Sequence, residues 1–300
     1  MKVLYFFLLI ITSMMTYAQQ PTLSFTFDDG STRDLAGHPL KEWNEMILSH
    51  LKHHEVQATF FVIGGNKLDE KGHYLLTSWN EAGHQIANHT FSHPNFNQED
   101  ITVERLKEEI LKTDSLIQQY TNFTPYFRFP YLSEGNTAEK ISLSRQFLKE
   151  INYKNGHVTI NDADWYIAGR LEQKLAENPD MDLEEFRNFY ISHVYEMALF
   201  FEQLGYDLTG RHIKHTLLLH HNLASAYFLG DLITKFKAEG WNIVAPEEAY
   251  QDPIYQKEPK HAGQSLLWAI MLDQAREEEM MQLLEQFSAY KKENMEELGL

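Results

Sequence analysis

Short apolar runs alternate along this chain with longer runs in which apolar residues recur about every three to four positions. The short runs predict buried strands, and the longer runs predict amphipathic helices. Strands are expected at 23–27, 58–63, 85–87, 126–129, 157–160, 216–219 and 241–244, and helices at 40–54, 70–82, 102–120, 137–150 and in a segment that ends at 239. This alternation predicts an α/β fold, a distorted (β/α) barrel of about seven parallel strands.

Two segments do not fit the alternation. Residues 166–212 form a long, mostly helical insertion between two strands, and residues 263–300 form a C-terminal helix rich in Glu and Lys. We expect both to be solvated helices that cover the sheet. The alternative for either segment is a lid or a dimer contact.

Residues 1–18 are typical of a signal peptide. Lys2 supplies a short positive region, an apolar run follows from 3 to 11, and Ala18 is a small residue at a suitable cleavage point. The run is shorter than the about 20 residues of a membrane-spanning helix, so we expect no stable membrane span after cleavage. The chain contains no cysteine, which fits an exported protein of a bacterial periplasm or exterior. An uncleaved anchor is the alternative.

The charge balance restricts the partners. With 26 basic and 43 acidic residues the formal net charge is -17, and a phosphate polymer would be repelled. We therefore expect no nucleic-acid partner. Because no thiolate is available, any metal site must use His, Asp or Glu, which favours a hydrolytic, zinc-type site.

Chemically capable side chains follow the ends of five predicted strands. The carboxyl ends of parallel barrel strands lie on one face, where the active sites of such barrels are built. The sequence therefore predicts that five separate segments converge on one site. They are Asp28-Asp29, His89 with His93, Arg128 to Tyr131, Asn161 to Trp165, and His220.

Taken alone, none of these features is specific, since Asp-Asp-Gly is common as a turn. The spacing of His89 and His93 places two imidazoles one turn apart on one side of a helix, which suits metal chelation. Other histidines share similar spacings by chance, and we expect these to lie on the surface: His50 with His54, and His212 with His215. His220 alone could be a core histidine, and His221 beside it is a second candidate.

Together the groups define a catalytic arrangement. One of the two neighbouring aspartates can bind a metal with His89 and His93, while the other stays free as a base. Three protein ligands leave coordination positions for water and substrate, as a catalytic zinc requires. The metal would acidify its water and polarise an acyl carbonyl, and an imidazole on the opposite side can protonate the leaving group.

The order of these segments resembles that of the polysaccharide deacetylase family with the NodB homology domain, also called carbohydrate esterase family 4. The segment from Thr26 to Gly30 resembles its first motif, which implies Asp28 as catalytic base and Asp29 as metal ligand. The segment from His89 to His93 resembles the second motif, which implies both histidines as ligands of a divalent metal. Zinc is the preferred ion, and cobalt, nickel or manganese are alternatives.

The third and fifth motifs supply further groups. Arg128 to Tyr131 resembles the third, in which the arginine orients the base and the tyrosine backbone N–H stabilises an oxyanion. Leu218 to His220 resembles the fifth, which implies Leu218 in the acetyl-methyl pocket and His220 as general acid.

The fourth motif departs from the family pattern. Asp164-Trp165 resembles it, which implies that Trp165 lines the groove and that an aspartate supports His220. The family pattern begins with an aspartate where this chain has Asn161, and Asp162 is offset by one position. The supporting carboxylate is therefore Asp164 or Asp162.

The resemblance implies a deacetylase domain over 19–262, interrupted by the insertion 166–212 and followed by the extension 263–300. It implies a hydrolase of carbon–nitrogen bonds that removes acetyl groups from an acetylated glycan, with N-acetylhexosamine units of peptidoglycan or chitin type as the first hypothesis. An O-acetyl ester deacetylase on a xylan-like glycan is the second. A non-catalytic carbohydrate-binding protein on the same scaffold is the third.

Overall fold

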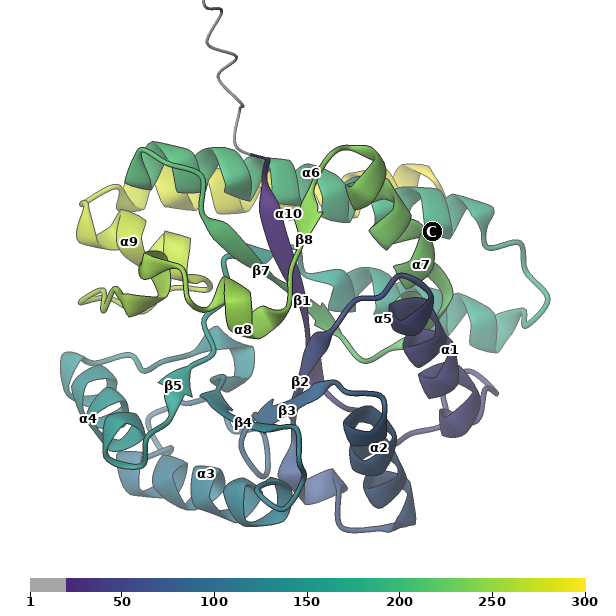
Figure 1. The fold of residues 1–300 in the computed structure, drawn as a ribbon. Helices are drawn as coiled ribbons and strands as arrows, with labels where there is room; N and C mark the ends of the chain where they lie inside the picture. The colour runs from purple at the N-terminus through teal and green to yellow at the C-terminus, as the bar shows by residue number, and fades with distance from the viewer. Residues whose placement is uncertain (1–19) are drawn as a thin grey trace, which may run out of the picture.

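The computed structural model describes residues 20–300, so the predicted signal peptide lies outside the described residues. Figure 1 shows strands and helices alternating along the chain. The strands are β1 Thr22–Asp29, β2 Ala58–Val62, β3 Gln85–Asn88, β4 Phe123–Phe127, β5 Lys154–Asn155, β6 Ile160–Asn161, β7 Lys214–His220 and β8 Asn242–Ile243. The helices include α1 Leu40–His53, α2 Glu70–Glu81, α3 Val103–Ile117, α4 Ala138–Glu150, α5 Asp164–Glu177, α6 Glu184–Thr209, α7 Leu223–Ala238, α8 Pro246–Ala249, α9 Leu266–Asp273 and α10 Glu277–Glu297. In the part of the chain from 20 to 300, no helix has the length and apolar character needed to cross a membrane.

The sheet confirms the predicted fold class. Seven strands pair in the order β5-β4-β3-β2-β1-β7-β6, and all neighbouring pairs are parallel. The short β8 pairs in parallel with the first residues of β1. The sheet curls and carries helices around its outside, which makes it a distorted half-barrel with β1 near its middle (Figure 1).

A short backbone segment spans the gap between the two edge strands of the barrel. β5 and β6 are consecutive in the chain, and residues 156–159 connect them. The Gly156 N–H donates to the Phe127 carbonyl at 2.6 Å, and the Thr159 N–H donates to the Thr216 carbonyl at 3.2 Å. The strand predicted at 157–160 is therefore only β6, displaced toward Asn161, because most of that segment crosses the gap instead of pairing.

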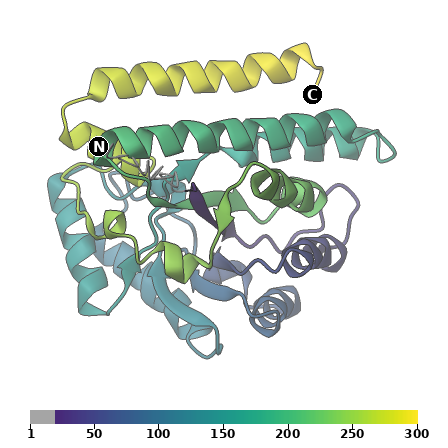
Figure 2. The same ribbon diagram turned by 45° about the horizontal axis from the view of Figure 1, so that its top comes forward.

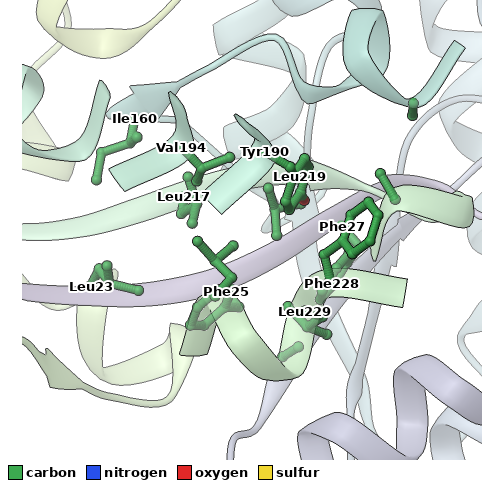
Figure 3. Close-up of a cluster of buried hydrophobic side chains, with 14 of the residues drawn as sticks. Leu23, Phe25, Phe27, Ile160, Tyr190, Val194, Leu217, Leu219, Phe228 and Leu229 are labelled. Atoms are coloured by element: carbon green, nitrogen blue, oxygen red, sulfur yellow. The ribbon is translucent and has the colours of Figure 1, made fainter. Parts of the chain in front are cut away.

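The two faces of β1 serve different purposes. Successive side chains of a strand point to opposite faces. Leu23, Phe25 and Phe27 enter the large hydrophobic core under the helices, which Figure 3 shows. Thr26 and Asp28 alternate with them and point into the barrel. The strand thus anchors the sheet with one face and carries polar chemistry on the other.

The helical insertion is part of the core. On α6, Tyr190 and Val194 are fully buried and join the cluster that includes Leu217 and Leu219 of β7 (Figure 3). The helix covers the sheet as predicted: one face is buried in this core, and its other residues are exposed or half-buried.

The C-terminal extension contains two helices where the sequence predicted one. The six residues from Leu266 to Met271 of α9 are all buried. The chain then turns at Ala275, which has a φ of 58°, and α10 begins. Figure 2 shows α10 lying along α6, and the rings of Phe200 and Phe287 meet there with centroids 4.4 Å apart. The extension and the insertion therefore form one layer.

Candidate active site

The loops that follow the strands have an unusual backbone. Asp29, Thr90, His93, Tyr131 and Ala163 all have positive φ, between 54° and 74°. The left-handed region costs a residue with a side chain about 1–2 kcal/mol. Such conformations persist only where the surrounding structure holds them, and they concentrate at functional sites.

Asp29, His89 and His93 come together at the ends of β1 and β3. One nitrogen or oxygen atom from each lies within 4.8 Å of the other two. Asp29 Oδ1 is 3.4 Å from His93 Nε2 and 3.7 Å from His89 Nε2. This oxygen is buried and has no hydrogen-bond partner, which is costly for a carboxylate unless a cation lies beside it. The three side chains therefore fit a divalent metal ion.

The two imidazoles are in the state that binds metal. His89 Nδ1 donates to the Arg128 carbonyl at 2.8 Å, which leaves the lone pair on Nε2. Burial lowers the pKa of His89 to about 3 and also lowers the pKa of His93, so neutral rings are favoured. The helical geometry predicted for this pair is wrong. A loop with left-handed residues at Thr90 and His93 brings the ring centroids to 4.9 Å.

Two imidazole nitrogens and one carboxylate oxygen form a donor set for a divalent metal ion, and three protein ligands leave positions for water and substrate. The Asp29 side chain is 36% exposed, whereas that of His89 is 2% exposed. The cluster thus opens to solvent on the Asp29 side, where a substrate could approach.

Asp28 is held separately from Asp29. Arg128 Nη1 donates to Asp28 Oδ1 at 2.6 Å and to Thr26 Oγ1 at 3.0 Å. Burial raises the pKa of Asp28, and the opposing charge of Arg128 does not cancel this effect. A raised pKa makes the carboxylate a stronger base, and the arginine fixes its direction.

Arg128 is itself buried among partners that the sequence did not indicate. Its Nε donates to the Gly156 carbonyl at 2.8 Å, and its Nη2 donates to the Tyr250 hydroxyl at 3.1 Å. The guanidinium carbon lies 3.9 Å from the centroid of the Phe61 ring. Phe61 and Tyr250 belong to the small hydrophobic cluster that also holds Ala87. Tyr250 comes after the last strand, and no local sequence pattern indicates that it contacts Arg128.

His220 is paired with Asp164. His220 Nδ1 donates to Asp164 Oδ1 at 2.6 Å, and Asp164 Oδ2 accepts from the His220 backbone and from Asn222 Nδ2. Asp162 is not the partner, since its Oδ1 accepts the Asp164 N–H at 2.9 Å. Burial lowers the pKa of His220, but the charge and hydrogen bond of Asp164 outweigh it and raise the pKa to about 10. This raised pKa, to which the charges of Asp29 and Asp28 also contribute, favours the protonated ring at neutral pH.

The two proton-transfer candidates lie on neighbouring strands. Asp28 and His220 are direct partners in the pairing of β1 with β7, so their side chains leave the sheet on the same side. Leu218, two residues before His220, faces that side as well and is buried. Tyr131 and Trp165 are 61% and 58% exposed, and the Tyr131 ring lies 4.6 Å from that of His93. Of the predicted substrate-binding residues, Tyr131 thus lies beside His93, and Leu218 faces the side of the sheet that carries Asp28 and His220.

Other histidines have structural roles. His221 is buried with Nε2 3.0 Å from Asn44 Oδ1, so it belongs to the core and cannot replace His220. His215 is fully buried, 2.9 Å from Glu202, and the prediction that it lies on the surface is wrong. The alternation of side chains along β7 explains this burial. His215 lies two positions before Leu217, so both side chains are on the face of the sheet that the helices cover.

Glu109 of α3, which the sequence did not single out, holds the loop of the two histidines. Its fully buried carboxylate accepts from the backbone N–H groups of Phe91 at 3.0 Å and Ser92 at 2.5 Å. It also accepts from the Ser92 hydroxyl at 2.9 Å and pairs with Arg105 at 2.7 Å. Because α3 packs beside β3, this contact fixes the loop that carries His93.

Lys67 holds the turn after β1 in a similar way. Its ammonium group is buried and donates to the Gly30 carbonyl and to Asn66 Oδ1, both at 2.5 Å. Burial lowers its pKa to about 7, against the charges of Asp29 and Asp69. A lone lysine after a strand gives no signal of this role in the sequence.

The fold and the site together define a class: an α/β half-barrel with a His-His-Asp cluster and two anchored proton-transfer groups at the ends of its parallel strands. Residues 17–154 match the model of the polysaccharide deacetylase family, so this part of the chain is similar to that family. The matched segment carries Asp28, Asp29, His89, His93 and Arg128, whereas the strand that bears the acid candidate lies beyond it.

Three curated relatives of this chain are named as deacetylases. The chain is 31% identical over 144 residues to a peptidoglycan-N-acetylglucosamine deacetylase of Bacillus cereus, which covers 48% of this chain and 46% of the relative. It is 28% identical over 236 residues to the enzyme of the same name from Listeria monocytogenes, with 77% and 39% covered. It is 36% identical over 99 residues to a chitooligosaccharide deacetylase of Rhizobium leguminosarum, with 33% and 38% covered. The chain thus spans less than half the length of these relatives.

Solved structures share the fold. A peptidoglycan N-acetylglucosamine deacetylase in complex with a benzamide superposes with a TM-score of 0.53 at 22% identity, covering 78% of this chain and 89% of that chain. A carbohydrate esterase family 4 pseudoenzyme from Bacillus anthracis gives a TM-score of 0.53 at 19% identity, covering 78% and 66%. At these identities the likeness supports the fold and not the activity.

Proposed function

We propose that this protein is a metal-dependent hydrolase that removes N-acetyl groups from N-acetylhexosamine units of a peptidoglycan- or chitin-type glycan. The observation that carries the proposal is the orphaned Asp29 oxygen, which lies between two neutral imidazoles and is flanked by the Asp28–Arg128 and Asp164–His220 pairs. The names of the relatives from Bacillus cereus, Listeria monocytogenes and Rhizobium leguminosarum support this substrate class.

Asp29, His89 and His93 would hold the metal, for which zinc is our first choice. A bound divalent ion lowers the pKa of water and polarises the acyl oxygen. Asp28, buried and directed by Arg128, takes the proton from the attacking water.

His220 supplies the second proton transfer. Its protonated ring, held by Asp164, donates a proton to the departing amine. The Tyr131 backbone N–H stabilises the oxyanion. Leu218 contacts the acetyl methyl group, and Trp165 lines the groove beside the sugar.

We propose further that residues 1–18 are a signal peptide and that the protein acts outside the cytoplasm, with its catalytic domain in 19–262. The insertion 166–212 and the extension 263–300 would belong to this exported protein. Amino-terminal sequencing of the secreted protein from a bacterial host tests this proposal. A sequence that begins after Ala18 supports cleavage, whereas a sequence that still contains the first residues contradicts it.

Acetate release tests the function. The purified protein, stripped of metal and reloaded with zinc, cobalt, nickel or manganese, is given acetylated chito-oligosaccharides, peptidoglycan and O-acetyl xylan. We expect acetate from the first two substrates, and elemental analysis to find zinc in protein purified without a chelator. Faster acetate release from O-acetyl xylan would show that the protein is an ester deacetylase. Binding without acetate from any substrate would identify a carbohydrate-binding protein.

The Asp28→Asn variant tests the base. The amide keeps the side-chain volume but cannot take the water's proton, so turnover should be lost while the metal remains bound. Asp231→Asn changes an exposed carboxylate of α7 and serves as the matched control. Activity that survives in Asp28→Asn would show that Asp28 is not the base.

A further inference from the structure

A pocket of about 490 Å³ lies beside the active-site loop, outside the cluster of metal and proton-transfer groups. Its volume falls within the range of about 300–1,000 Å³ for small-molecule sites. Its walls come from the loop before α5, from the start of α5, and from α6, α9 and α10. The residues used below are Asp162, Trp165, Tyr166, His193, Phe287 and Lys291.

Two buried polar atoms on this wall have no hydrogen-bond partner: Asp162 Oδ2 and His193 Nδ1. The two residues are only 2% and 4% exposed. His193 Nε2 donates to the Asp162 carbonyl at 2.8 Å, so Nδ1 carries a lone pair and needs a donor. Buried polar groups are normally satisfied, so two such atoms on residues that line one pocket point to a missing polar partner.

A cation and aromatic rings complete the pocket. Lys291 Nζ lies 5.7 Å from the centroid of Trp165 and 5.1 Å from that of Tyr166. It is also 3.5 Å from the Ala163 carbonyl. Phe287 adds another ring from α10. The pocket thus combines the two unpartnered atoms with the Lys291 ammonium group and apolar ring faces.

A hydroxyl group suits these polar atoms because it can donate to Asp162 or His193 and accept from Lys291. A pyranose ring carries several hydroxyls and has apolar C–H faces that pack on aromatic rings. Building on the function proposed above, we propose that this pocket binds a second sugar unit of the glycan chain whose acetyl group is removed.

The position of the pocket connects it to the reaction. Asp162 lines the pocket, and Asp164, two residues later at the start of α5, holds His220. Trp165, which is 58% exposed, lines the pocket immediately after Asp164. His193 belongs to the helical insertion and Lys291 to the C-terminal extension. The two segments that interrupt or follow the barrel thus form a subsite that selects longer chains.

Calorimetric titration of the metal-free full chain with N-acetylglucosamine oligomers of increasing length tests this subsite. We expect long oligomers to bind at least about tenfold more tightly than the monosaccharide. Lys291→Met and His193→Phe should remove most of that gain, because each deletes one polar contact. Lys235→Met is the matched control, since Lys235 makes the same kind of contact with the Tyr195 ring at 4.7 Å, away from the pocket.

His193 is buried, so its variant could fail to fold. Circular dichroism checks this, and Lys291→Met on the outer helix tests the same pocket independently. Equal affinity for all lengths, or a length effect that both folded variants retain, would overturn the subsite. Acetate release measured in parallel separates the proposals. Release without a length effect refutes only the subsite, whereas length-dependent binding without release supports the subsite and refutes the catalytic function.

Discussion

Replacement of Glu109 by Gln should weaken metal binding although Glu109 touches no predicted ligand. Its carboxylate accepts from two backbone N–H groups of the histidine loop through one oxygen and from Arg105 through the other. An amide presents oxygen on one side only. In one orientation the amide NH₂ group of the new glutamine faces the guanidinium of Arg105. In the other orientation it faces the backbone N–H groups of the loop. In both cases two hydrogen-bond donors face each other.

The expected loss follows from these contacts. A hydrogen bond to a charged group contributes about 1.5–3 kcal/mol, which sets the expected loss of unfolding free energy. Partners that orient metal ligands typically change metal affinity by about 10–100-fold. Urea denaturation of the metal-free protein measures the first quantity, and zinc titration against a competing chelator measures the second.

Glu108→Gln is the matched control, because Glu108 is the exposed neighbour on the same helix. It should leave both measurements within error of the wild type. If Glu109→Gln folds and binds zinc as tightly as Glu108→Gln, then the loop does not depend on this carboxylate and the reasoning is wrong.

Three further variants test other parts of the structure. Asp164→Asn removes the charge that raises the pKa of His220 to about 10, so the alkaline limb of the activity profile should move to lower pH; an unchanged limb would separate His220 from that ionisation. Tyr250→Phe leaves one nitrogen of the buried guanidinium without its acceptor and should cost about 1–3 kcal/mol in urea unfolding. Leu171→Ala, in the core face of the insertion, should cost about 2–5 kcal/mol, whereas Leu199→Ala at an exposed position should cost far less; equal losses would mean that the insertion does not share the core.

The barrel was predictable because its signal is local. The apolar run at 58–62 is too short for a buried helix and ends before Gly64, which favours a buried strand, and the amphipathic run that follows favours a helix. The two-residue strand β5 is too short to leave a pattern. The burial of α6 depends on the sheet face that it covers, which no window of sequence contains.

The positions of the site groups were predictable for a different reason. Parallel strands deliver their ends to one face, so Asp28, His89 and His220 had to converge once the fold was known. The groups that hold them were not predictable. Glu109 and Lys67 are ordinary charged residues of the sequence, and only tertiary packing shows that each is buried against a turn of the site.

The left-handed residues of the strand-end loops have an evolutionary consequence. Glycine would relieve such a backbone, yet at Asp29 and His93 it would delete a predicted ligand. Ala163 has only a methyl group to lose, so among these strand-end loop residues it is the position where glycine could increase thermal stability with least change to the side chains. Selection for heat resistance should therefore act on the loop before α5 and leave the strain at the metal ligands in place.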